Sequence, residues 1–170
     1  MTNRQIDLEN VDRVNELVYE KLEPKYIRVQ TTLAVMGYLC LMLLMLGLLF
    51  FDEFSYRTLL IIAVEALLFF LALVNVWLVP KAYHFKGFAV REHDISYRSG
   101  LFFPKTITVP FCKIQQVNVR QGFVPRLFGL YEIDVVNGAQ MLSSLVIPGL
   151  TAERANDIKE LVMRKVKDEK

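Results

Sequence analysis

The chain has 170 residues, of which 54% are hydrophobic and 22% charged, with a net charge of +2. Most of the apolar excess lies in residues 33–51 and 58–79, and the remainder has the composition of an ordinary soluble protein. This distribution excludes a wholly soluble, a wholly intramembrane and a disordered chain. The chain also has no Arg/Lys-rich runs, which argues against a nucleic-acid partner.

Residues 1–30 are predicted to form a cytoplasmic N-terminal segment with an amphipathic helix over residues 5–22. Its apolar positions recur every three or four residues, at Leu8, Val11, Val14, Val18 and Leu22. Pro24 ends or kinks the helix before the membrane. The pattern favours a helix that covers part of the cytoplasmic domain over one that binds a partner. Its acidic character argues against insertion into anionic lipid.

Residues 31–80 are predicted to form a transmembrane hairpin. Residues 33–51 and 58–79 are each long and apolar enough to cross a bilayer as helices. The connecting residues 52–57 are too few for anything but antiparallel neighbours. Lys21, Lys25 and Arg28 precede the first span, and Lys81, Lys86, Arg91 and Arg98 follow the second. The loop has only Arg57, so both termini of this multi-pass chain are predicted to be cytoplasmic.

One acidic residue, Glu65, interrupts the second span. It shares a helical stripe with Thr58 and Ala72, and Asn75 lies one turn beyond. Such a stripe of polar and small residues predicts a packing face toward the first span or another subunit. An intramembrane carboxyl is also a functional-site candidate. A structural, hydrogen-bonded role is favoured over transport, since no basic partner is found in the first span.

Residues 81–170 carry 14 Lys and Arg against 9 Asp and Glu, and are predicted to form one cytoplasmic domain. Alternation of apolar and polar residues predicts six strands there. They are placed near 83–91, 93–99, 102–109, 113–120, 130–136 and 140–147. Residues 124–129 are predicted to form a turn or short helical piece, and Asn137-Gly138 a hairpin turn.

Pro148-Gly149 is predicted to stop the sheet, after which Thr151 caps a final helix. Its apolar stripe consists of Ala155, Ile158, Val162 and Val166. The fold class is therefore an α+β membrane protein. A two-helix hairpin precedes an antiparallel barrel or sheet, similar to a pleckstrin-homology (PH) domain, that the C-terminal helix closes.

The domain shows no pattern typical of catalysis, metal binding or cofactor binding. Glu132 and Asp134 lie on one predicted strand and are interpreted as a solvated edge. Cys40 and Cys112 are interpreted as reduced, structural thiols.

Several cations are candidates for contacts with lipid headgroups or a partner. Lys81, Lys86 and Arg91 follow the second span, although positive-inside topology alone explains the first two. Arg120 and Arg126 flank a turn where they could grip a phosphate or a partner carboxylate. Arg126 has an equal chance of bracing its own turn only.

Four motifs in the predicted domain carry a family resemblance. They are Tyr97-Arg98-Ser99-Gly100, Val109-Pro110 with Lys113-Ile114-Gln115-Gln116-Val117, Arg126-Leu127-Phe128-Gly129-Leu130, and Ile147-Pro148-Gly149-Leu150. With the preceding hairpin, they resemble the bacterial membrane-flanked PH-domain family (bPH2, formerly DUF304) of the YdbS-like type over residues 20–166. The chain departs from the family at Val136-Asn137-Gly138, where Thr-Ala-Gly is frequent.

The resemblance implies a PH-like fold at a bacterial cytoplasmic membrane, often beside a second, longer family member, with no enzymatic activity or cofactor. We therefore expect a non-catalytic membrane protein that contacts lipid and assembles with itself or a related bPH2 protein. The alternatives are a component of an oligomeric export or resistance system against membrane-active agents, and a reader of lipid headgroups.

Overall fold

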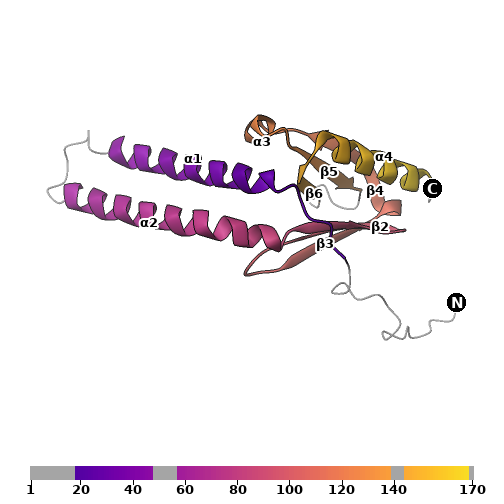
Figure 1. Ribbon diagram of the computed structural model, residues 1–170, viewed down its shortest axis with the longest axis horizontal. Coiled ribbons are helices and arrows are strands. Elements are labelled where there is room, and N and C mark those ends of the chain that lie inside the picture. Colours follow the sequence, from indigo (N-terminus) through magenta and orange to yellow (C-terminus); the bar gives the residue numbers. More distant parts are fainter. Residues whose placement is uncertain (1–17, 48–56, 139–143, 169–170) are drawn as a thin grey trace.

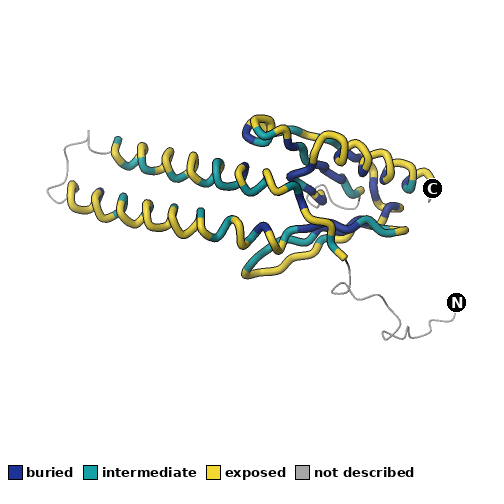
Figure 2. The backbone as a smooth tube through the Cα atoms, in the orientation of Figure 1, coloured by how far each residue is buried: buried dark blue, intermediate teal, exposed yellow. Residues whose placement is uncertain are grey.

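The computed structural model describes residues 18–47, 57–138 and 144–168. Two long helices, α1 (Lys25–Gly47) and α2 (Arg57–His84), lie side by side and extend away from a smaller α+β domain (Figure 1). Both helices are long and apolar enough to cross a membrane. Figure 2 shows that their residues are mostly exposed, whereas the buried residues concentrate in the domain. The hairpin is thus built to face lipid.

The helix bounds differ from the predicted spans at the end next to the domain. α1 begins at Lys25 rather than Leu33, and α2 continues through Pro80 to His84. Proline is tolerated within a membrane helix because its surroundings can satisfy the freed backbone carbonyl. The two helices therefore continue beyond their apolar stretches toward the domain. Residues 48–51 of the first predicted span lie outside the described residues.

The domain contains two three-stranded antiparallel sheets, which confirms the predicted α+β fold class. One sheet consists of β1 (Gly87–Val90), β2 (Asp94–Ser99) and β3 (Lys105–Pro110). The other consists of β4 (Ile114–Arg120), β5 (Tyr131–Asn137) and β6 (Leu145–Leu150). A 3-10 turn (Phe111–Lys113) joins the sheets, and the short helix α3 (Phe123–Leu127) joins β4 to β5.

The core lies between the two sheets and helix α4 (Ala152–Asp168). Alternation along the strands aims their apolar side chains inward, and Ile95, Ile133 and Ile147 have no exposed surface. On α4 the predicted stripe is buried throughout, at Ala155, Ile158, Val162 and Val166. The backbone N–H of Arg154 donates to Thr151 Oγ1 at 3.2 Å, which confirms the predicted cap.

The prediction that Pro148-Gly149 stops the sheet is wrong, because β6 runs through both residues to Leu150. Gly149 has φ +68°, and a side chain there would meet the ring of Tyr26 at 2.7 Å. The pair thus bends the strand where the base of α1 presses against it. At a sheet edge, proline removes no essential ladder bond.

Residues 18–24, called here the pre-span segment, hold the hairpin to both sheets. Glu20 pairs with Phe88 of β1 in an isolated antiparallel bridge, and Glu23 N–H donates to Gly149 O of β6 at 2.9 Å. Leu22 is buried in the core, and its carbonyl accepts a hydrogen bond from the Tyr83 hydroxyl on α2. The domain therefore includes chain from both sides of the hairpin.

The helix predicted over residues 5–22 does not extend through residues 18–22, where the backbone is not helical. Sheet pairing at Glu20 takes the place of a last helical turn. Residues 5–17 of that prediction lie outside the described residues.

Candidate functional site

The five cations singled out from the sequence do not form one cluster. Lys81 lies near the end of α2, with Nζ 3.3 Å from the centre of the exposed Trp77 ring. Lys86 is half-buried beside Tyr26, and burial lowers the pKa of its ammonium group. Arg126 is exposed on α3. These three are close to the hairpin end of the domain, where the chain leaves or approaches the membrane helices.

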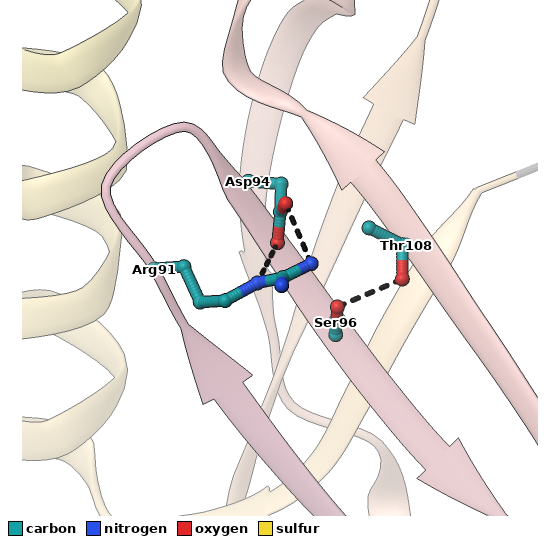
Figure 3. Close-up of polar contacts among 4 residues, drawn as sticks. All are labelled: Arg91, Asp94, Ser96 and Thr108. Atoms are coloured by element: carbon teal, nitrogen blue, oxygen red, sulfur yellow. Dashed lines mark hydrogen bonds and ion pairs between the residues drawn. The ribbon is translucent and has the colours of Figure 1, made fainter. Parts of the chain in front are cut away.

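Arg91 and Arg120 each form an ion pair with a carboxylate of the domain. Arg91 Nε and Nη2 donate to the two carboxylate oxygens of Asp94, each at 2.8 Å (Figure 3). This turn between β1 and β2 lies at the end of β1 away from α2. Arg120 Nη2 lies 2.9 Å from Asp134 Oδ2. Both guanidinium groups thus brace their own strands.

Asp134 is not on a solvated edge as the sequence suggested, because only 5% of it is exposed. It lies on the central strand of its sheet, opposite Asn118 and Val146, and its neighbours cover it. One carboxylate oxygen pairs with Arg120, and Oδ1 has no hydrogen-bond partner among the described residues. In the neighbouring sheet, the buried Ser96 makes a partly buried polar contact with the exposed Thr108, Oγ to Oγ1 at 2.8 Å (Figure 3).

Glu65 is half-buried and lines a hollow of about 520 Å³ on the hairpin. The hollow is lined by Leu46, Thr58, Ile61, Ile62, Glu65, Ala66 and Phe69. Glu65 Oε1 is shielded from solvent and has no hydrogen-bond partner among the described residues. The structure therefore brings Glu65 and Thr58 of the predicted stripe to one place. Ala72 is half-buried and Asn75 exposed, and neither lines the hollow.

A groove of about 560 Å³ runs between β1 and α4. Val18 and Glu20 line it from the pre-span segment, and Glu20 forms an ion pair with Arg154 of α4. No sequence pattern indicates this groove, because its walls come from three distant parts of the chain. Among the described residues, no group of three or more His, Cys, Asp or Glu side chains is placed to hold a metal ion.

Sequence reasoning also missed four exposed apolar side chains in the connections of the domain. Phe102 and Phe103 are 72% and 89% exposed between β2 and β3. Phe123 and Leu127 are 78% and 69% exposed on α3. The available signal was the run Leu101-Phe102-Phe103 between Gly100 and Pro104, where a turn normally carries polar residues.

Comparison with known proteins gives one family and two relatives. The family model described as Bacterial PH domain matches residues 31–166. The chain is 29% identical to the UPF0699 transmembrane protein YdbS of Bacillus subtilis (strain 168) over 94 residues, 55% of this chain and 57% of YdbS. It is 25% identical to the UPF0699 transmembrane protein YdbT of the same organism over 92 residues, 51% of this chain and 19% of YdbT. These matches span less than two thirds of either relative. No solved structure gives a significant match.

Proposed function

The chain belongs to the bacterial PH domain family, and we propose that it is a non-catalytic membrane protein that presents a PH-like interaction domain. In this proposal it assembles with a second copy of itself or with a related bacterial PH-domain membrane protein. The YdbS-like character, the two membrane-length helices and the α+β domain supply the framework. The fold alone does not define a ligand, because function is set by particular residues.

The observation that carries the assembly is the carboxyl oxygen of Glu65 in the hairpin hollow, for which the described residues supply no hydrogen-bond partner. A polar group in hydrocarbon costs several kcal/mol when it lacks a hydrogen bond. Neighbouring membrane helices commonly supply that bond from Ser, Thr, Asn, Gln or His side chains. A helix of another chain that fills the hollow would satisfy Glu65 and cover the apolar walls around it.

The relatives support a partner of the same family. YdbS and YdbT occur in one organism, and the stretch of YdbT that matches is only 19% of that protein. Two family members of very different length thus coexist in that organism. From this observation we propose a mixed assembly. In it, a shorter and a longer member pair through their membrane helices.

The proposal treats the domain as non-catalytic because its polar contacts have structural uses. Arg91 pairs with Asp94, Ser96 pairs with Thr108 across two strands, and Arg120 pairs with buried Asp134. We place the chain in the bacterial cytoplasmic membrane with both termini inside. The support for this orientation is the excess of Lys and Arg before α1 and after α2 relative to the loop between them.

The test is the mass of the full-length protein in mild detergent, measured by light scattering after gel filtration. We expect the wild type to form a dimer or larger assembly and Glu65→Leu to shift it toward the monomer. Glu65→Gln, which keeps hydrogen-bonding capacity, should retain more of the assembly. Asn75→Leu is the matched control, because Asn75 is an exposed polar residue of the same helix outside the hollow.

A strictly monomeric wild type would overturn self-assembly. Co-purification from native membranes would then decide whether a longer family member is the partner. An assembly that Glu65→Leu and Asn75→Leu weaken equally would show that the Glu65 hollow is not the contact.

A further inference from the structure

Two apolar tips project from the domain: Phe102–Phe103 in the β2–β3 turn and Phe123–Leu127 on α3. Their large side chains are between 69% and 89% exposed at Phe102, Phe103, Phe123 and Leu127. Single exposed apolar residues are ordinary on protein surfaces. Adjacent exposed phenylalanines and a short helix with two bare apolar side chains are typical of a surface that meets another apolar phase.

The path of the chain puts both tips at the hairpin end of the domain. β1 begins at Gly87, directly after α2 ends at His84, so it leads away from the membrane helices. β2 is antiparallel to β1 and therefore returns toward that end. β4 leads into α3, and Val124 of α3 packs on Val29 near the start of α1, so α3 lies at the same end. Gly87 pairs with Arg98, so the β2–β3 turn extends past the start of β1 toward the hairpin. Figure 1 shows this turn and α3 at the hairpin end, with α1 and α2 between them.

Helix α3 has a defined depth along α1. Val124 and Leu130 pack on Val29 of α1 in a small cluster separate from the main core. Val29 lies about 6 Å along the helix axis from Lys25, at the level of Arg28. The apolar stretch of α1 begins one turn later, at Leu33. The exposed side chains of α3 therefore lie at the level where the headgroup layer meets the hydrocarbon.

The backbone of the β2–β3 turn presents its phenylalanines rigidly. Gly100 has φ +104°, and a Cβ atom there would lie 2.1 Å from the carbonyl oxygen of Phe103. Only glycine fits this close approach, and Pro104 restricts the other side of the turn. A tip already ordered in this way loses little conformational freedom when it enters an interface.

Charge near the tips agrees with an anionic membrane surface. Residues 98–106 and 121–130 contain no Asp or Glu. Lys105 and Arg126 are exposed beside the two tips, and Lys81 is exposed at the end of the second span. Apolar side chains flanked by cations at this depth are characteristic of interfacial membrane contact.

We propose that both apolar tips insert into the leaflet that the hairpin crosses. The occupant of this surface is the bilayer that already holds α1 and α2, because the tips flank the two spans at the hairpin end of the domain (Figure 1). Insertion at two points beside the hairpin would fix the domain against the membrane and leave the groove between β1 and α4 facing the cytoplasm. This contact is independent of the assembly state.

The test uses the full-length protein in phosphatidylcholine vesicles with brominated acyl chains, which quench nearby tryptophan. The wild type has one tryptophan, Trp77, near the end of the second span, and it serves as the reference. In a Trp77→Phe background, tryptophan is introduced by Phe103→Trp or Phe123→Trp. The control is Leu161→Trp, on an exposed position of α4 that lies in the groove and not at a tip.

We expect brominated lipid to quench emission at positions 103 and 123 to an extent comparable with Trp77, and to leave position 161 unquenched. Lack of quenching at either tip would overturn insertion at two points. Blue-shifted emission that the lipid does not quench would overturn it in favour of a protein contact. Phe102→Trp provides a second probe of the same turn, and far-UV circular dichroism verifies that each variant is folded.

Discussion

Helices α2 and α4 use apolar residues in opposite ways. Helix α2, of 28 residues, is apolar on all sides over most of its length, and its large apolar side chains are mostly exposed in the structure. The 17 residues of α4 have one apolar stripe, and its four residues are all buried. A helix that is apolar all round needs lipid, whereas an amphipathic helix covers a protein core. The arrangement of apolar residues, more than their number, thus determines whether a helix faces lipid or covers a protein core.

The pre-span segment and Tyr83 are where these two regions meet. Leu22 is buried in the domain core and Tyr83 is buried at the end of α2. The hydroxyl of Tyr83 donates to the carbonyl of Leu22. The junction between hairpin and domain is therefore packed like a protein interior, which predicts that the domain keeps a fixed orientation relative to the spans.

The largest expected effect comes from comparing a substitution in the domain core with one on the exposed surface of α2. Ile133→Ala removes a side chain with no exposed surface from the centre of the domain. It should lower the free energy of unfolding of the domain by about 2–5 kcal/mol, since it leaves a cavity as well as losing buried area. Leu73→Ala, on a position of α2 that is 56% exposed and does not line the Glu65 hollow, should leave it unchanged. Pulse proteolysis in lipid nanodiscs over a urea series measures both.

Equal destabilisation by the two substitutions would break the comparison. It would mean that α2 packs against protein at Leu73 as tightly as the sheets pack at Ile133. A second chain on the hairpin is then the explanation to examine.

A smaller effect, dependent on pH, probes the junction. Burial, with a contribution from nearby Tyr26, raises the pKa of the Tyr97 phenol above its ordinary value of 10.0. The folded domain therefore holds a proton that the unfolded chain releases above pH 10. The resulting stability is fully present below pH 10 and is lost as pH rises, by up to about 1.4 kcal/mol per pH unit.

Unfolding midpoints at pH 9 and pH 11 test this expectation, with Tyr97→Phe as the comparison. The variant should lose less stability between the two pH values than the wild type. Lys86 acts in the opposite direction, because its lowered pKa makes stability rise with pH up to about 10.5. Comparing the two proteins cancels this contribution. Equal losses would show that the Tyr97 hydroxyl reaches solvent in the folded state.

The sequence predicted most of the fold because its signals are local. Alternation located the strands, and the spacing of Ala155, Ile158, Val162 and Val166 located the buried face of α4. The helix predicted before the first span failed at Glu20, because pairing with the distant Phe88 outweighs local helical periodicity. Asp134 was misread for a related reason, since its burial depends on neighbouring strands.

The candidate sites were harder to predict, because they depend on residues that only the fold brings together. The hollow at Glu65 uses Leu46 from the other span, and the groove combines the pre-span segment with β1 and α4. The apolar tips were visible as Leu101-Phe102-Phe103, but their meaning depends on which end of the domain they reach. Strand order supplies that information, and composition does not.

The smallest expected effect tests which contacts hold the pre-span segment to the domain. Glu20 and Arg154 form an ion pair whose side chains are 49% and 46% exposed. Glu20→Gln should cost less than about 1 kcal/mol of domain stability, and this loss should shrink at high salt. Leu22→Ala, at a position only 2% exposed, should cost more and be insensitive to salt, because it removes buried apolar contacts. Pulse proteolysis at 0.1 M and 1 M salt measures the domain stability of both variants and distinguishes the two contributions. A larger, salt-dependent loss from Glu20→Gln would show that charge at the groove, and not packing at Leu22, holds the hairpin to the domain.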